Sequence, residues 1–286
     1  MDMKNFWFSY QNILRGEILK KKYFSFFRKI FGILYKFLVR YFRHKLSINC
    51  INIDQVDNKN LSGLSLNELF IHFNSDKGSY FFSGNEKLSS HYYSIFYEKY
   101  LKHLKEKELT LLELGSHEGR GLVSFFYYFP NAFIIGANIN PFQMKFESKR
   151  ITELFVDVSS KKILKNLSNH IEGDLDIIVD DASHNLRDII IAFSILFKKV
   201  KKGGVYVIED LNQFEAFKEL NPYGDNEITP LQLLLKIKNK ENFQSSFLSD
   251  EEKEYLIKNI DSINLEKGSM IINGLNVSDI AFIHKK

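Results

Sequence analysis

The sequence predicts an α/β protein built on a doubly wound, mostly parallel sheet. Two observations lead to this fold class: short apolar runs alternate with helical patterns between residues 109 and 208, and several of these runs end in acidic or glycine-containing turns. Short apolar runs are typical of parallel strands that are buried on both faces. Strands that alternate with helices are the pattern of βαβ units.

Five predicted strands alternate with four predicted helices along the chain. The predicted strands are residues 109–114, 132–139, 154–156, 175–179 and 205–208. The predicted helices are residues 119–129, 141–149, 159–169 and 185–200. Pro141 would occupy the first turn of the second helix, and residues 201–204 would close the last helix with two lysines followed by glycine.

The C-terminal part is expected to complete the sheet. Residues 229–239 and 250–259 have helical patterns, and residues 269–273 with 279–284 are predicted to form an antiparallel hairpin. The expected domain is therefore a Rossmann-like, doubly wound, mostly parallel seven-stranded sheet with an antiparallel C-terminal hairpin. Upstream of it, helical residues 64–70 and 91–104 flank a loop, residues 75–90, that contains glycine and serine.

Composition narrows the class of protein. The chain has 286 residues, of which 44% are hydrophobic, enough for a substantial core. Its lone cysteine, Cys50, excludes a disulfide framework and is compatible with a reducing compartment. We expect neither a cleaved signal peptide nor a membrane-spanning helix, because the necessary apolar stretches are missing.

The first fifty residues differ from the rest in charge. They carry eleven Lys and Arg against Asp2 and Glu17, a net of +9, so the remainder of the +4 chain carries −5. Residues 21–43 predict an amphipathic helix with a Phe- and Leu-rich face opposite a basic face. This pattern favours a peripheral helix on the inner face of the cytoplasmic membrane, anchored through residues 1–45. The alternatives are packing on the main domain, contact between copies in a homo-oligomer, and nucleic-acid binding, which the continuous Phe stripe disfavours.

These patterns divide the chain into three parts. Residues 1–50 form the basic amphipathic helical arm, and residues 51–105 form a linker and a helical cap on the substrate side. Residues 106–286 form the α/β domain. The boundary is the polar, Asn- and Asp-rich stretch at residues 49–62.

Two acidic clusters carry the chemistry. Asp180-Asp181-Ala182-Ser183-His184 follows the fourth predicted strand, and Glu209-Asp210 follows the fifth. Ligands of open α/β sheets bind beyond the carboxyl ends of the strands, so the two clusters should meet in one crevice. Converging carboxylates suit a divalent cation, and a nearby histidine suits a general base. Taken singly, each residue could instead be a helix cap or a solvated strand end.

A glycine-rich turn follows the first predicted strand. It runs from Glu113 to Gly121 and includes Gly115, Ser116 and Gly119. A dinucleotide-binding turn would require glycine where His117 stands, so an NAD-dependent enzyme fits poorly. The acidic Glu113 favours a ligand with an amine, such as S-adenosylmethionine (SAM).

The chain resembles the class I SAM-dependent methyltransferases, and within them the metal-dependent sugar O-methyltransferases of the mycinamicin and tylosin macrolide-sugar type and their polysaccharide-associated relatives. The resemblance covers about residues 64–286. The motifs that carry it are the two acidic clusters together with Asp76-Lys77-Gly78, His91-Tyr92-Tyr93 and Tyr97-Glu98-Lys99-Tyr100-Leu101.

The resemblance implies a role for each matching residue. Asp181, Glu209 and Asp210 would hold Mg²⁺, with Asp181 and His184 as the catalytic residues and His184 as the base. The residues implied for SAM binding are Glu113, Gly115, Ser116, Gly119, Asn138, Asp157 and Asp180. Asn138 departs from the family, which usually has an acidic residue for the ribose, so SAM binding is expected to be weaker.

The resemblance thus implies a SAM-dependent, Mg²⁺-assisted enzyme that methylates a sugar hydroxyl in surface glycan or glycosylated metabolite biosynthesis. Two alternatives remain at this point. One is a non-catalytic, membrane-associated protein with a degenerate methyltransferase fold, and the other is an NAD-dependent or hydroxylase-like Rossmann enzyme.

Overall fold

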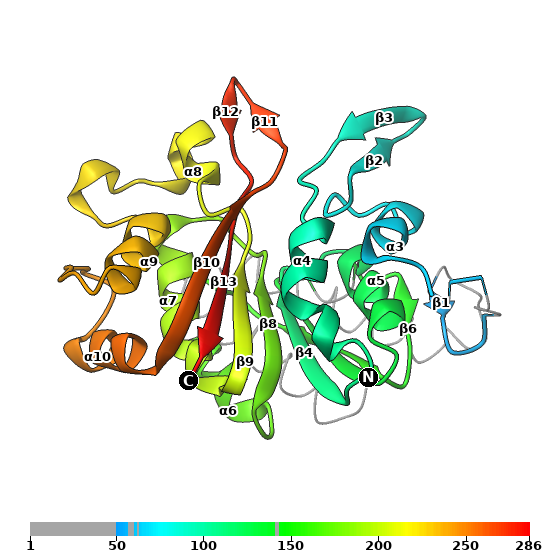
Figure 1. The fold of residues 1–286 in the computed structure, drawn as a ribbon, viewed down its shortest axis with the longest axis horizontal. Coiled ribbons are helices and arrows are strands. Elements are labelled where there is room, and N and C mark those ends of the chain that lie inside the picture. Colours follow the sequence, from blue (N-terminus) through cyan, green and yellow to red (C-terminus); the bar gives the residue numbers. More distant parts are fainter. Residues whose placement is uncertain (1–49, 57–59, 62, 141–142) are drawn as a thin grey trace, which may run out of the picture.

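A seven-stranded sheet runs through the middle of the molecule (Figure 1). The computed structural model describes residues 50–286 apart from 57–59, 62 and 141–142, so the predicted helix at residues 21–43 lies outside the described residues. Across the sheet, the strands are β10 (Ile260–Lys267), β13 (Asp279–Lys285), β9 (Val200–Ile208), β8 (Leu175–Asp180), β4 (Leu109–Leu114), β5 (Ala132–Asn138) and β7 (Ile151–Phe155). β13 pairs antiparallel with both of its neighbours, β10 and β9, and all the other pairs in this sheet are parallel. The predicted fold class is confirmed.

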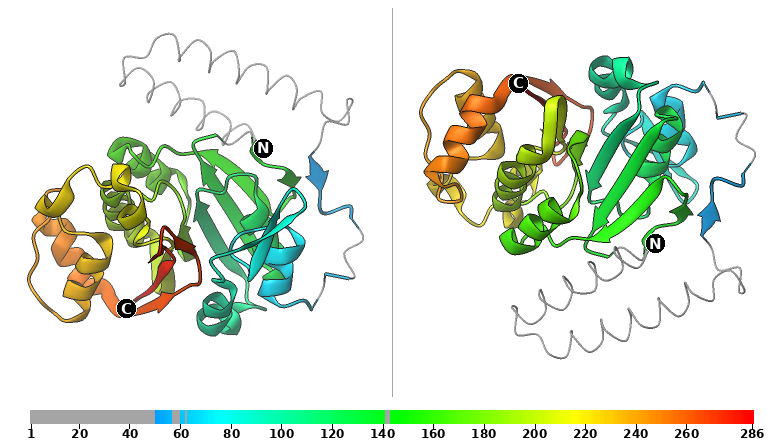
Figure 2. Two further views of the ribbon diagram at one scale, coloured as in Figure 1. Left: turned by 90° about the horizontal axis from the view of Figure 1, so that it is seen from above. Right: turned by 90° about the horizontal axis from the view of Figure 1, so that it is seen from below.

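Helices cover both faces of the sheet (Figure 2). Alternate side chains of a strand point to opposite faces, so Leu111 and Leu112 of β4 belong to two different cores. The first face packs on α3 (Leu66–His72), α4 (Ser94–Leu101) and α5 (Arg120–Tyr128). The second packs on α6 (Lys161–His170), α7 (Leu186–Leu196), α9 (Pro230–Lys238) and α10 (Asp250–Asn259).

The helix predicted at residues 141–149 is wrong. Phe146–Glu147 form a short strand, β6, which pairs in parallel with β1 (Ile51–Asn52). Met144 and Phe146 are buried, and Lys145 donates its backbone N–H to the Glu118 carbonyl at 3.0 Å. Contacts with distant segments therefore override the local helical pattern.

The predicted end of the last helix is also wrong. Helix α7 ends at Leu196, a 3-10 turn (Phe197–Lys199) follows, and β9 already begins at Val200. Gly203 and Gly204 lie inside this strand. A Cβ at Gly204 would come within 2.8 Å of the Asp176 carbonyl, so glycine permits the close approach of β9 to β8.

The C-terminal hairpin pairs differently from the prediction. The partner of β13 is β10, Ile260–Lys267, and the predicted first arm contributes only β11 (Ile271–Ile272), which pairs with β12 (Leu275–Asn276). Strand β10 lies at the edge of the sheet and alternates apolar with polar residues, so it shows no continuous apolar run.

Two small hairpins stand at the end of the sheet where the parallel strands finish (Figure 1). One is the β11–β12 hairpin. The other is formed by β2 (Tyr80–Ser83) and β3 (Glu86–Ser89) and lies within the segment predicted as a loop. The short helix α8 (Gln213–Ala216) follows β9 at the same end.

Candidate active site

Three neighbouring strands bring their acidic ends together. Backbone hydrogen bonds continue past the strands, from Asp181 N–H to the Leu114 carbonyl and from Glu209 N–H to the Asp180 carbonyl, each at 3.0 Å. The residues after β8 and β9 are therefore held as firmly as the strands themselves. The two clusters predicted to share one crevice do so.

The turn after β4 depends on its glycines. Gly115 has φ +86°, and a Cβ there would lie 1.8 Å from the Asp181 carbonyl oxygen. Gly119, with φ +84°, is the N-cap of helix α5 and faces the Met144 sulfur. Any side chain at Gly115 would displace Asp181, the residue that follows β8. The position of the acidic cluster therefore depends on glycine in this turn.

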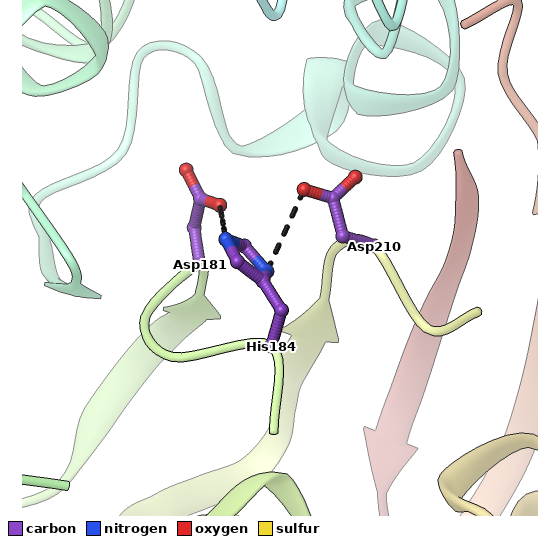
Figure 3. Close-up of side chains that lie close together, drawn as sticks. All are labelled: Asp181, His184 and Asp210. Atoms are coloured by element: carbon purple, nitrogen blue, oxygen red, sulfur yellow. Dashed lines mark ion pairs between the residues drawn. The ribbon is translucent and has the colours of Figure 1, made fainter. Parts of the chain in front are cut away.

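Asp181, His184 and Asp210 lie close together at the ends of β8 and β9 (Figure 3). His184 Nε2 lies 3.8 Å from Asp181 Oδ1, and His184 Nδ1 lies 3.5 Å from Asp210 Oδ2. One ligand atom from each residue falls within 4.8 Å of the others, a spacing that a metal ion could bridge. Two carboxylate oxygens and an imidazole nitrogen are suitable donors for a divalent cation.

The backbone is strained at the same residues. His184 has φ +52° and Asp210 has φ +53°, values that are uncommon for residues other than glycine, although Asn, Asp and His adopt them more often than the rest. His117, in the turn after β4, has φ +44°. Such positions cost about 1 kcal/mol or more and tend to occur at functional sites, where they direct a side chain into the cleft.

Glu209 is bonded through both carboxylate oxygens to other side chains. It is 2% exposed; its Oε2 accepts a hydrogen bond from Lys77 Nζ at 2.5 Å, and its Oε1 accepts one from the Tyr97 hydroxyl. It therefore does not join the group formed by Asp181, His184 and Asp210. Its role as a metal ligand stays a prediction.

Lys77 is the site residue to which the sequence assigned no role. Its side chain is 4% exposed, and its Nζ lies 2.5 Å from Asp181 Oδ2, 2.5 Å from Glu209 Oε2 and 3.5 Å from Glu113 Oε1. Burial alone would lower the pKa of this lysine, but the carboxylates outweigh it and hold the pKa well above its usual value. The sequence feature that could have indicated Lys77 is the Asp76-Lys77-Gly78 motif. A lysine in a loop is usually exposed, so the motif alone does not predict its burial.

Burial, Lys77 and the nearby histidines together shift the pKa values of the carboxylates. Burial raises the pKa of Asp181, but Lys77 and His184 more than offset it, so the pKa lies below its usual value. For Asp210 burial outweighs the nearby histidines and raises the pKa. For Glu113 burial likewise outweighs Lys77 and raises the pKa to about 7.

Asp210 is supported from the side of helix α4. Its Oδ1 accepts a hydrogen bond from the Tyr93 hydroxyl at 2.6 Å and lies 3.1 Å from His91 Nδ1. His91 Nδ1 is also 2.9 Å from Ser278 Oγ. Tyr93 is fully buried, so it supports the site from behind, whereas His91 lines the cleft.

Two adjoining cavities meet at the turn after β4. The larger, of about 650 Å³, is lined by Asp181, His184 and Asp210 as well as by Phe81 and Phe82 of the β2–β3 hairpin. The smaller, of about 250 Å³, is lined by Asp157 and Asp188, among others. Both are lined by Gly115, Asn138 and Ala182, so the cavities adjoin at these residues.

The residues predicted to bind SAM divide between these cavities. Glu113 and Ser116 line the larger one and Asp157 the smaller, while the Asn138 amide donates weakly to the carbonyls of His117 and Asn140, at 3.5 and 3.4 Å. Glu113 Oε2 and Ser116 Oγ are buried without a hydrogen-bond partner, as expected for groups that face a polar ligand. Asp180 lines neither described cavity and accepts a hydrogen bond from the Tyr206 hydroxyl at 3.0 Å.

The sheet order, the glycine turn and the acidic strand ends together define the fold of the class I SAM-dependent methyltransferases. Comparison with solved structures confirms this fold. The MycE methyltransferase of the mycinamycin pathway, in complex with Mg, SAH and mycinamycin VI, superposes with a TM-score of 0.56 at 20% identity, covering 78% of this chain and 54% of that one. No family model matches the sequence.

Curated relatives confirm the resemblance to sugar O-methyltransferases. An 8-demethyl-8-α-L-rhamnosyl tetracenomycin-C 2'-O-methyltransferase of Streptomyces olivaceus is 28% identical over 54% of this chain and 42% of its own length. Demethylmacrocin O-methyltransferase of Streptomyces fradiae is 31% identical over 51% of this chain and 39% of its own length. The chain thus matches about two fifths of the length of these relatives.

The raised pKa of Glu113 predicts how stability changes with pH. A carboxyl group whose pKa rises on folding stabilises the folded state below its unfolded pKa, and this contribution is lost as pH rises through about 7. We expect Glu113→Gln to reduce the loss of unfolding free energy between pH 5 and 8 by up to about 3 kcal/mol. Urea unfolding of the wild type and of Glu113→Gln in EDTA at several pH values measures this pH dependence of the unfolding free energy.

Glu118→Gln is the matched control. Glu118 lines the same cavity, but a hydrogen bond from Lys145 contributes most to holding its pKa below the usual value. This variant should follow the wild-type pH dependence above pH 6. A Glu113→Gln protein with the wild-type slope between pH 5 and 8 would contradict the raised pKa.

Proposed function

We propose that the protein is a SAM-dependent, Mg²⁺-assisted O-methyltransferase that acts on a sugar hydroxyl. The observation that carries the proposal is the group formed by Asp181, His184 and Asp210, which lines a cavity that adjoins the pocket around Asn138 and Asp157. The relatives that match this chain include O-methyltransferases whose names specify rhamnosyl, olivosyl or mycinamicin acceptors. Their names support a sugar as the acceptor.

The described residues fit both ligands. Asp181 Oδ1 and Asp210 Oδ2 face the same space and would hold the cation, while the buried, unpartnered Glu113 Oε2 suits the amine of SAM. When bound, SAM supplies a methyl group on a sulfonium leaving group, and Mg²⁺ supplies positive charge beside the accepting hydroxyl.

His184 is placed to accept the proton of the hydroxyl. Its ring lies between Asp181 and Asp210, and its side chain is 22% exposed, so it reaches the cleft. The flanking carboxylates stabilise the positive charge that the ring gains when it takes the proton. They also orient the ring, so that proton transfer begins from a restricted set of geometries.

We propose further that the acceptor belongs to surface glycan or glycosylated metabolite biosynthesis. Phe81 and Phe82 line the same cavity as the acidic residues, which provides an apolar wall beside the polar floor. A sugar carried on a larger apolar group fits this combination. A methyl-transfer screen against nucleotide-linked, lipid-linked and free glycans, with SAM and Mg²⁺, would identify the class.

The proposal predicts different losses for the base and for the cation ligands. His184→Ala should lower kcat by about 10²–10⁴-fold, because general base catalysis contributes that much, while SAH and Mn²⁺ binding measured by calorimetry stay near wild type. Asp210→Asn should lose Mn²⁺ binding along with activity, since it removes a charged ligand.

His103→Ala is the matched control, because His103 is exposed in the 3-10 turn Lys102–Leu104, away from the cleft. Unchanged turnover in His184→Ala would refute its role as the base. Loss of Mn²⁺ binding in the same variant would make it a metal ligand instead.

We also propose that residues 1–45 attach the enzyme to the inner face of the cytoplasmic membrane. The support is the sequence: a basic face opposite a Phe- and Leu-rich face suits an anionic lipid surface. Within the described part of the chain, no helix is long and apolar enough to cross a membrane.

Deletion of residues 1–45 tests this attachment. Full-length protein should sediment with vesicles that contain anionic lipid, and binding should weaken as salt is raised, because the basic face contributes to it. The truncated protein should stay in the supernatant under all conditions. Equal partitioning of the two proteins would rule out the arm as an anchor.

A further inference from the structure

Lys77 lies between the ends of three neighbouring strands. Its ammonium contacts Glu113 at the end of β4, Asp181 after β8 and Glu209 after β9. These strands are adjacent in the sheet, so a single cation spans both the side of the cleft that faces Glu113 and the side that faces Asp210. Among the described residues, no other lysine or arginine forms an ion pair with these three carboxylates.

The structure gives this lysine a fixed place. The Lys77 carbonyl accepts from the Ser94 N–H at 3.0 Å, and the Asp76 carbonyl accepts from the His91 N–H at 3.0 Å. These bonds tie the segment to the start of α4. On the other side, a Cβ at Gly121 of α5 would lie 2.9 Å from Lys77 Cε and 2.8 Å from Glu113 Oε1. Glycine at this position therefore leaves the room through which the lysine stem reaches the carboxylates.

The two oxygens of Asp181 have different surroundings. Oδ2 accepts from Lys77, whereas Oδ1 faces His184 and the open side of the site. The ammonium thus neutralises Asp181 from behind without covering the edge that faces the cleft. Buried carboxylates without a nearby cation are costly, so removal of Lys77 would leave three of them poorly compensated.

We propose that Lys77 is a positioning residue: a fixed internal cation that holds Glu113, Asp181 and Glu209 in place, so that a divalent ion enters on the opposite side of Asp181. This inference rests on the proposed metal-assisted function. The lysine and the divalent ion then share the task of compensating one set of carboxylates, and loss of the first makes folding more dependent on the second.

Lys77→Met tests the proposal, since methionine keeps most of the apolar stem and removes the charge. In EDTA we expect its Tm to fall by about 10 °C, because one partner of a buried ion pair has been removed. Addition of Mn²⁺ should raise the Tm of this variant more than that of the wild type. Lys99→Met is the control. Lys99 pairs with Glu266 at the surface, so its loss should change neither the Tm in EDTA nor the Tm increase with Mn²⁺ appreciably.

A double variant separates charge from packing. If Lys77 acts through its charge, Lys77→Met combined with Glu209→Gln should be more stable in EDTA than Lys77→Met alone, although it carries one more substitution. If Lys77 acted only through packing, the stability losses of Lys77→Met and Glu209→Gln would add in the double variant. A double variant no more stable than Lys77→Met, or insoluble like it, overturns the proposal, and so does a Lys77→Met protein as stable as the wild type.

The Tm response to Mn²⁺ distinguishes failure of the metal-assisted function from failure of the positioning role of Lys77. If the wild type shows no Tm shift with Mn²⁺, the metal-assisted function fails, while the comparison of single and double variants in EDTA still decides the role of Lys77. If the wild type responds to Mn²⁺ and Lys77→Met responds by the same amount, the positioning role fails and the metal site stands.

Discussion

Four carboxylates, three of them buried, gather at the ends of three adjacent strands, and this is the constraint on which the rest of the site depends. Glu113, Asp181, Glu209 and Asp210 come from strand ends that hydrogen bonds hold in register. Like charges at such distances repel, and burial adds to the cost of ionisation. The surrounding cation, histidines and tyrosine hydroxyls are the groups that make this arrangement compatible with a folded chain.

The supporting groups come from segments far away in the sequence. Lys77 precedes the β2–β3 hairpin, Tyr93 and Tyr97 lie at the start of α4 and within it, and Ser278 precedes β13. The segment before the first strand of the sheet is therefore part of the active-site wall. Its helices also share the buried core with β4, so the site and the fold are stabilised by the same packing.

The sequence predicted the sheet and the acidic strand ends because these features are local. Residues 109–114 and 175–180 are mostly apolar, and the acidic residues of the site lie at their ends or directly after them. The sequence did not predict two features that depend on distant contacts. Phe146–Glu147 pair with Ile51–Asn52, and β10 is an edge strand in which polar residues separate the apolar ones. The sequence also assigned no role to Lys77, because burial of a loop lysine follows from three strands meeting, which no single segment encodes.

The carboxylates divide their oxygens between the protein and the cleft. Asp181 turns Oδ2 to Lys77, and Asp210 turns Oδ1 to Tyr93 and His91; each leaves its other oxygen facing His184. Glu209 instead gives both oxygens to protein groups. The reactive edge of each aspartate is therefore oriented before any ligand arrives, because the opposite edge is already bonded. Preorganisation of this kind favours the proposed reaction, since groups already in position need little further rearrangement when charge develops.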